Sequence, residues 1–186
     1  MKIDLHIYCD QNKIYTQLEV VRNFLPTMKK AGIKYTFDLS ELSTSEHENK
    51  EKIQKIIDTK SFQRGCEKLM KEWDKRSDSI IQAIQKIISS NIAPNDPIVF
   101  FNCYCIPFGC SGYFNTPNEI FINVLLNNTE FQIQTIIHEF FHLVYQTHTS
   151  GLEYSAREKF VDDLFNELPL KKEFPNYEAQ NFNINK

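Results

Sequence analysis

Three ionisable side chains stand close together in the second half of the chain, in the segment His138-Glu139-Phe140-Phe141-His142. Residues four apart lie on one face of an α-helix, so His138 and His142 can present two imidazole nitrogens to a single metal ion. Zinc held in this way lowers the pKa of a bound water to about 7, and Glu139 can accept the proton as the water attacks an amide carbonyl. The spacing therefore predicts a zinc site with Glu139 as the general base of a hydrolytic reaction.

This pattern is uncommon enough to be informative. With 5 histidines in 186 residues, a chain of this composition would contain it by chance about 0.01 times. Its surroundings are strongly apolar, with Ile133, Ile136, Ile137, Phe140, Phe141 and Val144. Ionisable groups on such a helix are costly unless they have a role. A chance match or a hydrogen-bonded pair of core histidines is the weaker interpretation.

A catalytic zinc site usually takes three protein ligands, so one more is expected after His142. His148 has the interval of the pattern H-E-x-x-H-x-x-G-x-x-H, but Tyr145 stands where that pattern needs glycine. Glu153 falls in the turn after Gly151, and loops hold ligands less rigidly than helices. Both remain alternatives to a residue further along the chain.

The favoured third ligand is Glu158, which precedes Asp162 by four residues. Helical spacing resumes from Ser155, with apolar residues at Val161, Leu164, Phe165 and Leu168. The two carboxylates would share a helix face that borders this apolar stripe. Glu158 could then bind zinc while Asp162 accepts the other ring N–H of a ligand histidine. The alternative is a capping box of Ser155 and Glu158, with Asp162 in solvent.

Together, H-E-F-F-H at 138–142 and E-K-F-V-D at 158–162 resemble the gluzincin group of zinc metallopeptidases, especially its small members. The resemblance covers roughly residues 97–170. It implies peptide-bond hydrolysis, with Zn²⁺ bound by His138, His142 and Glu158, Glu139 as the base and Asp162 behind the ligands. The rival hypothesis is a zincin-like binding or regulatory module without peptidase turnover, and the intact Glu139 argues against it.

The resemblance also implies how the substrate is bound. The run 118–137 is similar to the family's edge strand and active-site helix, so a peptide or protein substrate is expected along an edge strand at about 119–124. Family members commonly stabilise the oxyanion with a Tyr or His, yet no histidine follows His148. Tyr154 is the expected catalytic phenol, and the others available are Tyr145 and Tyr177.

The elements around the motif can be predicted from apolar spacing. T-E-F-Q at 129–132 has the spacing of a capping box, so the motif helix is expected from about 130 to 147. Two strands are expected before it, over the apolar run 98–104 and over 119–124, with a loop containing glycine and proline between them.

The first half of the chain is predicted to be mainly helical. Alternation or helical spacing predicts strands over 3–7 and 33–39 and helices over 14–28 and 69–88. Pro26 should kink the first helix. The polar stretch 40–50 reads as an exposed loop or helix start, and the segment 91–97 should end the long helix.

These elements predict a single α+β domain over 1–186 with a zincin-like fold. We expect a small twisted mixed sheet of about four strands, with the active-site helix behind it, the Glu158 helix alongside and a helical N-terminal half. The parts would be an N-terminal strand and helix region (1–95), a metal-site region (96–170) and a C-terminal tail (171–186). Zinc would lie in a cleft beneath the edge strand.

Composition and charge argue against nucleic acid as a partner and against a membrane span. A formal charge of −3 and a pI near 6.0 give no electrostatic reason to bind nucleic acid. No apolar run is long enough to span a bilayer, and charge interrupts the apolar residues of the first six positions. A cytoplasmic location is expected, although a secreted enzyme that had lost its signal peptide would also begin in this way.

The cysteine pattern favours reduced thiols. Five cysteines cannot all pair within one chain, and the number is low for a disulfide scaffold: Cys9, Cys66, Cys103, Cys105 and Cys110. The spacing of the last three could also describe a thiolate metal cluster. Small buried thiols on one face of a strand are the more ordinary interpretation.

Overall fold

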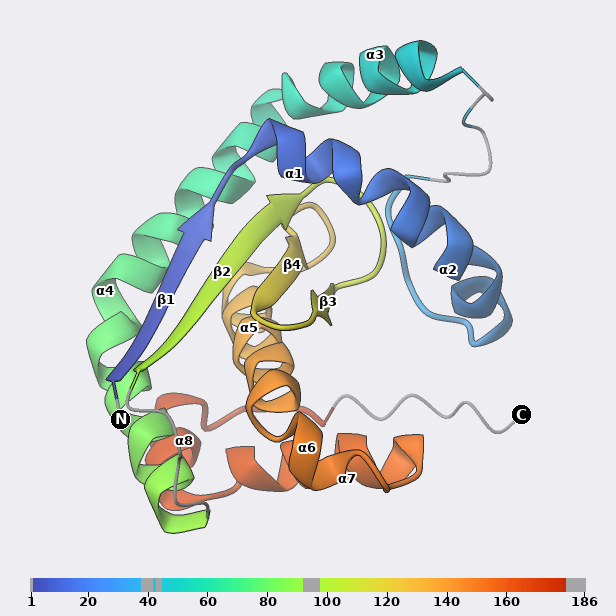
Figure 1. The fold of residues 1–186 in the computed structure, drawn as a ribbon. Helices are drawn as coiled ribbons and strands as arrows, with labels where there is room; N and C mark the ends of the chain where they lie inside the picture. Colours follow the sequence, from blue (N-terminus) through green and yellow to red (C-terminus); the bar gives the residue numbers. More distant parts are fainter. Residues whose placement is uncertain (1, 38–41, 43–44, 92–97, 180–186) are drawn as a thin grey trace.

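A four-stranded mixed sheet forms the centre of the molecule (Figure 1). The structure is a computed structural model that describes residues 2–37, 42, 45–91 and 98–179. From one edge to the other, the strands are β1 (Lys2–Tyr8), β2 (Ile98–Ile106), β4 (Glu119–Asn123) and β3 (Gly112–Asn115). The first three run parallel, and β3 pairs antiparallel with β4. The expected α+β class with a four-stranded mixed sheet is confirmed.

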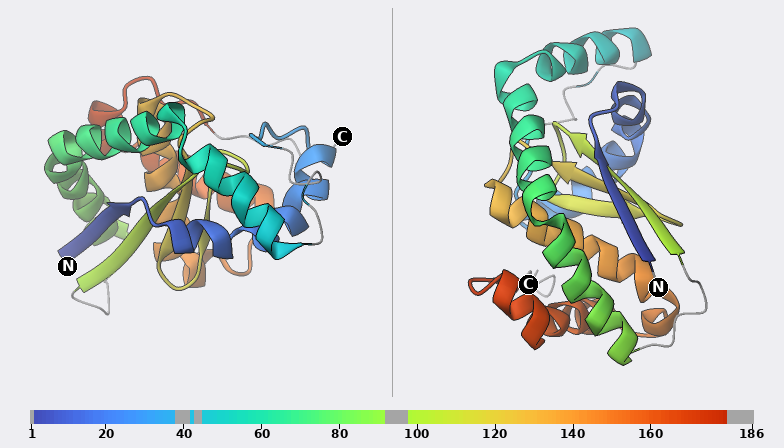
Figure 2. Two further views of the ribbon diagram at one scale, coloured as in Figure 1. Left: turned by 90° about the horizontal axis from the view of Figure 1, so that it is seen from above. Right: turned by 90° about the vertical axis from the view of Figure 1, so that its left-hand side faces the viewer.

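Eight helices surround this sheet in the described part of the chain. They are α1 (Gln11–Thr16), α2 (Leu18–Lys30), α3 (Glu46–Ile57), α4 (Lys60–Asn91), α5 (Thr129–Val144), α6 (Gln146–Thr149), α7 (Tyr154–Phe165) and α8 (Leu168–Glu173). Helix α5 packs against β3 and β4, and α7 packs against α5. Figure 2 shows α4 running the length of the molecule, from α3 at one end to α8 at the other.

The core is built largely from buried side chains of the two interior strands and of α5. Strands β2 and β4 have neighbours on both sides, and their apolar residues Phe101, Ile106, Ile120, Phe121 and Ile122 are buried. Helix α5 is buried at every position from Gln132 to Leu143. A helix buried all round must be apolar nearly throughout, which explains the hydrophobic sequence of this segment. The motif residues therefore lie inside the molecule.

The start of α5 differs by one residue from the predicted capping box. The N-cap is Asn128, whose side chain accepts a hydrogen bond of 2.9 Å from the N–H of Phe131. Thr129, the predicted cap, is already the first helical residue. The helix ends at Val144, before the predicted 147, and α6 follows after Tyr145.

The edge strand beside the motif helix is β3, and the prediction of an edge strand at about 119–124 is wrong. Residues 119–123 form β4, which lies between β2 and β3. The sequence placed only a loop where β3 forms, because its four residues are all half-buried and lack an apolar run. The edge next to the motif helix therefore belongs to Gly112–Asn115.

The predicted strand over 33–39 is not formed in its described part. Residues 33–37 make only an isolated bridge between Thr36 and Gly109, and residues 38 and 39 lie outside the described ranges. Phe37 adopts φ of 55°, in the left-handed region, so the backbone leaves the extended conformation there. A strand cannot continue through such a residue.

The predicted helix over 14–28 is divided at Gln17 into α1 and α2. Pro26, where a kink was predicted, lies inside α2, which continues to Lys30. The long helix over 69–88 is confirmed and extends to Lys60 and Asn91. The segment 92–97 lies outside the described residues. Among the described helices, none is both long and apolar enough to cross a membrane.

The polar stretch 40–50 and Leu168 were also assigned from the sequence. The polar stretch 40–50 contains the start of α3, where Ser45 accepts a hydrogen bond from the N–H of Glu48; positions 40, 41, 43 and 44 are outside the described residues. Leu168, assigned from its spacing to the buried stripe, is 74% exposed because α7 has already ended at Phe165.

Candidate metal centre

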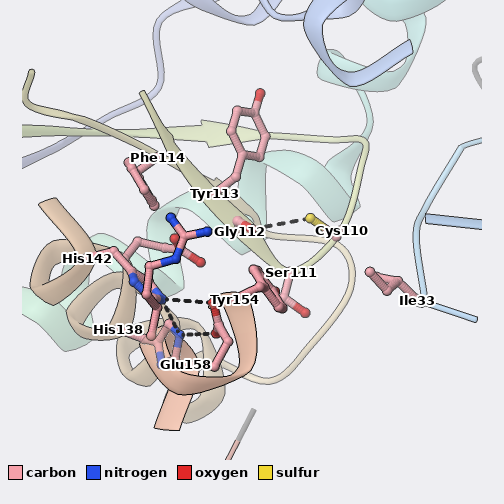
Figure 3. Close-up of a pocket in the computed structure, with 12 residues that line it drawn as sticks. Ile33, Cys110, Ser111, Gly112, Tyr113, Phe114, His138, His142, Tyr154 and Glu158 are labelled. Carbon is pink, nitrogen blue, oxygen red and sulfur yellow. Dashed lines mark hydrogen bonds and ion pairs between the residues drawn. The ribbon is translucent and has the colours of Figure 1, made fainter. Parts of the chain in front are cut away.

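His138 and His142 lie one helical turn apart on α5 and point to the same place as Glu158 of α7 (Figure 3). The two Nε2 atoms are 3.0 Å apart. Glu158 approaches both rings, with Oε2 3.0 Å from Nε2 of His138 and Oε1 3.3 Å from Nε2 of His142. One donor atom from each residue lies within 4.8 Å of the other two, so the group could hold a metal ion.

The donor set and its spacing fit zinc. Ligands about 2.0 to 2.2 Å from a tetrahedral ion lie about 3.3 Å from one another, which matches the separations above. The side chains are 2%, 9% and 11% exposed for His138, His142 and Glu158. Two imidazole nitrogens and a carboxylate that meet in a buried site are a donor set suited to one divalent cation. Within the described part of the chain this is the one such group of His, Cys, Asp or Glu side chains.

Of the three candidates for the third ligand, the structure brings only Glu158 to the histidines. His148 packs instead against the rings of Tyr145 and Phe160. Glu153 is exposed at the N-cap of α7. The alternative capping box beginning at Ser155 is not formed, because Ser155 is already inside the helix.

The cysteines do not form a second metal cluster among the described residues. All five are free thiols. Cys103 and Cys105 are buried in β2, whereas Cys110 lines the pocket at the candidate metal centre, where its Sγ donates to the carbonyl of Gly112 at 3.2 Å.

Asp162 lies on the Nδ1 side of His138, but it does not accept the ring N–H directly, as the sequence predicted, because the hydroxyl of Tyr177 contacts both groups. Asp162 Oδ1 is 3.6 Å from Nδ1 of His138, too far for a hydrogen bond. The hydroxyl of Tyr177 lies 3.3 Å from that Nδ1 and donates to Oδ1 of Asp162. Tyr177 stacks on Phe165 with centroids 3.8 Å apart, which fixes the phenol. The sequence offered Tyr177 only as an oxyanion candidate.

The carboxyl groups of Glu139 and Glu158 sit in contrasting environments. Burial raises the pKa of Glu139 above its ordinary range, and the nearby histidines offset this only in part. Burial also acts to raise the pKa of Glu158, but hydrogen bonds from His138 and His142 outweigh it and hold that pKa at about 2. Glu158 is thus suited to remain an anionic ligand, and Glu139 is the better proton acceptor.

A pocket opens beside these groups and beneath the edge strand. Its lining combines the motif residues with β3 and α7: Ile33, Cys110, Ser111, Gly112, Tyr113, Phe114, His138, Glu139, His142, Tyr154, Arg157 and Glu158. The cleft expected beneath an edge strand is present, though under β3. The ring of Phe114 stacks on His142 with centroids 5.7 Å apart.

Tyr154, predicted as the catalytic phenol, lines this pocket and is 40% exposed. Burial and the negative charges of Glu158 and Glu139 raise the pKa of its hydroxyl. Tyr154 therefore keeps its proton and can donate a hydrogen bond. Arg157 also lines the pocket, although nothing in the sequence singles it out beyond its position one residue before Glu158.

Comparisons with protein-family models, curated proteins and solved structures found no significant match to this chain. The interpretation of the site therefore depends on its own residues, their distances and their burial.

Proposed function

We propose that the chain is a zinc-dependent metallopeptidase of the gluzincin type with a zincin-like fold. The observation that carries this proposal is the convergence of His138, His142 and Glu158, with Glu139 buried beside them, at the floor of a pocket. A site made only for structure would not need a carboxylate of raised pKa next to an accessible cavity.

Each side chain has a distinct role in peptide hydrolysis. Zinc, when bound, supplies an acidified water and polarises the carbonyl of the scissile bond. Glu139 accepts the proton of the attacking water and can return it to the leaving amine. Tyr154 keeps its proton and can donate it in a hydrogen bond to the developing oxyanion. Tyr177 and Asp162 hold the ring of His138 from behind.

Strand β3 is the proposed support for an extended peptide. It pairs with β4 on one side, and no described strand pairs with its other side. Gly112, Tyr113 and Phe114 of this strand also line the pocket. A peptide added at this edge would hydrogen-bond to the backbone of β3 and pass across the metal centre.

The substitution Glu139→Gln tests the proposal. It keeps the shape of the side chain but removes the base, so we expect hydrolysis of a peptide library to fall by about a hundredfold or more while zinc stays stoichiometric. Glu153→Gln changes an exposed glutamate near the site, so peptide hydrolysis and zinc content should both stay unchanged. Full activity in Glu139→Gln would overturn the mechanism. Zinc binding without cleavage of any peptide by the unchanged chain would indicate a binding module.

A further inference from the structure

Arg157 faces the metal centre together with two residues already given roles. Tyr154, Arg157 and Glu158 stand at positions i, i+3 and i+4 of α7, so they share one helix face. All three line the pocket. A permanent positive charge is thus placed within the proposed substrate-binding space.

This guanidinium has no acidic partner in the described part of the chain. Its Nε is buried and makes no hydrogen bond. Two carboxylates line the same pocket, but Glu158 is engaged by the histidines and Glu139 makes no ion pair with Arg157. Arginine cannot lose its proton in a protein, and burying a donor without a hydrogen-bond partner is unfavourable. Such an arrangement favours a ligand that supplies the missing acceptor.

The balance of charge in the pocket points the same way. Apart from the two histidines, its charged lining residues are Glu139, Glu158 and Arg157. Two lining carboxylates would balance a bound divalent cation, and Arg157 adds a positive charge to that lining. The third nearby carboxylate, Asp162, lies behind His138, outside the lining, and accepts a hydrogen bond from Tyr177. The remaining lining residues carry no charge that could offset that of Arg157. The loaded pocket would therefore attract an anion.

We propose that Arg157 recognises a carboxylate of the substrate, so that the enzyme prefers peptides with an acidic group beside the scissile bond. The inference rests on the proposed function. A planar guanidinium binds a carboxylate through two parallel hydrogen bonds, which gives both affinity and orientation. The carboxylate is either an Asp or Glu side chain or the free C-terminus of the peptide. Arg157 is a specificity residue in this proposal, and Tyr154 is the donor to the oxyanion.

Binding and cleavage of matched peptides test this. The peptides are acetylated and identical except for Asp or Asn at one position beside the cleavage point, and each is made with a C-terminal amide or a free acid. Dissociation constants are measured on the zinc-loaded Glu139→Gln protein, and kcat/KM on the chain with Glu139 intact. We expect either the Asp side chain or the free C-terminal carboxylate to improve binding about tenfold. Comparing the Asp with the Asn peptides, and the free-acid with the amide peptides, shows which of the two carboxylates is recognised.

The variants separate specificity from structure. Arg157→Gln should abolish the preference for the acidic peptide with unchanged zinc content, and Arg157→Lys should retain part of it. Lys159→Gln removes a positive charge from the same helix at a solvent-exposed position and should keep the full preference. Equal dissociation constants for the acidic and neutral peptides would overturn the inference. It would also be overturned if Arg157→Gln lowered kcat/KM equally for acidic and neutral peptides. Selective binding without any cleavage would instead refute the peptidase proposal and leave anion recognition standing.

Discussion

At the residue scale, His138 is held at both of its ring nitrogens. Its Nε2 faces Glu158 at 3.0 Å, and its Nδ1 faces the hydroxyl of Tyr177 at 3.3 Å. Tyr177 in turn donates to Asp162 and is stacked on Phe165. The orientation of a ligand histidine is commonly set by such a partner on its second nitrogen. The phenol therefore belongs to the machinery that positions the proposed ligand.

Removing this hydroxyl should weaken zinc binding without removing the site. We expect Tyr177→Phe to lower zinc affinity about tenfold, because the ring of His138 loses the contact that orients it. Competition with a chromophoric chelator measures this. Tyr8→Phe removes a hydroxyl from an exposed tyrosine of β1 and should have no effect. Equal zinc affinity of Tyr177→Phe and the unchanged chain would show that Asp162 orients the ring alone.

The sequence could predict the residues whose positions follow from helical periodicity. His138 and His142 are four apart on one helix, and Glu158 stands out through its spacing to Asp162. Tyr177 could not be assigned in this way. It follows α8 in a non-helical segment, so spacing says nothing about where its hydroxyl points.

At the element scale, three of the four strands were predictable, including the edge strand β1 from its alternation over 3–7, and the edge strand β3 was not. Strand β4 and the second half of β2 are buried on both faces, so their sequences are nearly continuous apolar runs, whereas Phe100 in the first half of β2 is exposed. Strand β3 has four half-buried residues, Gly112–Asn115, and forms because β4 offers a partner. Its place depends on contacts between segments, which local periodicity does not record.

The N-cap of α5 and the segment after α2 are two more features that the local sequence did not determine. Asn128 and Thr129 are both good capping residues, and only the hydrogen bond to the N–H of Phe131 decides between them. The alternation over 33–39 favours a strand, but the positive φ of Phe37 prevents it. Tertiary geometry decided both outcomes.

Close packing of β3 on α5 should make Gly112 intolerant of any side chain. A Cβ there would lie 2.7 Å from Cγ2 of Thr135 and 2.8 Å from Cδ1 of Ile122. We expect Gly112→Ala to reduce the free energy of unfolding by about 1 to 3 kcal/mol, measured by urea denaturation. Gly151→Ala is the control, since nothing lies within 4 Å of its added Cβ. An unchanged stability of Gly112→Ala would mean that β3 does not pack tightly on α5.

At the scale of the whole molecule, the proposed metal centre joins segments that are distant in the chain. Helix α5 supplies two donors and α7 the third, while Tyr177 reaches the site from beyond α8. Helix α8 packs on both α4 and α7. A metal ion bound at this point would cross-link the central helix to the C-terminal part of the fold.

Removing zinc should therefore destabilise the whole fold. A ligand that binds only the folded state adds about 2.7 kcal/mol at a free concentration of a hundred times its Kd. We expect Tm to fall when a chelator is added and to recover with excess zinc. The double variant His138→Ala and His142→Ala should show no response to zinc. If the Tm of the unchanged chain is the same with and without the chelator, the result would argue against a metal at this site.

The most direct test is a crystal structure of the zinc-loaded chain with anomalous diffraction recorded at the zinc edge. We expect one strong peak, bonded to Nε2 of His138, Nε2 of His142 and a carboxylate oxygen of Glu158 at about 2.0 to 2.2 Å. The peak should lie in the pocket beneath β3, beside Glu139. A peak at His148 or at the cysteines, or no peak at this position in protein that carries stoichiometric zinc, would contradict the proposed centre.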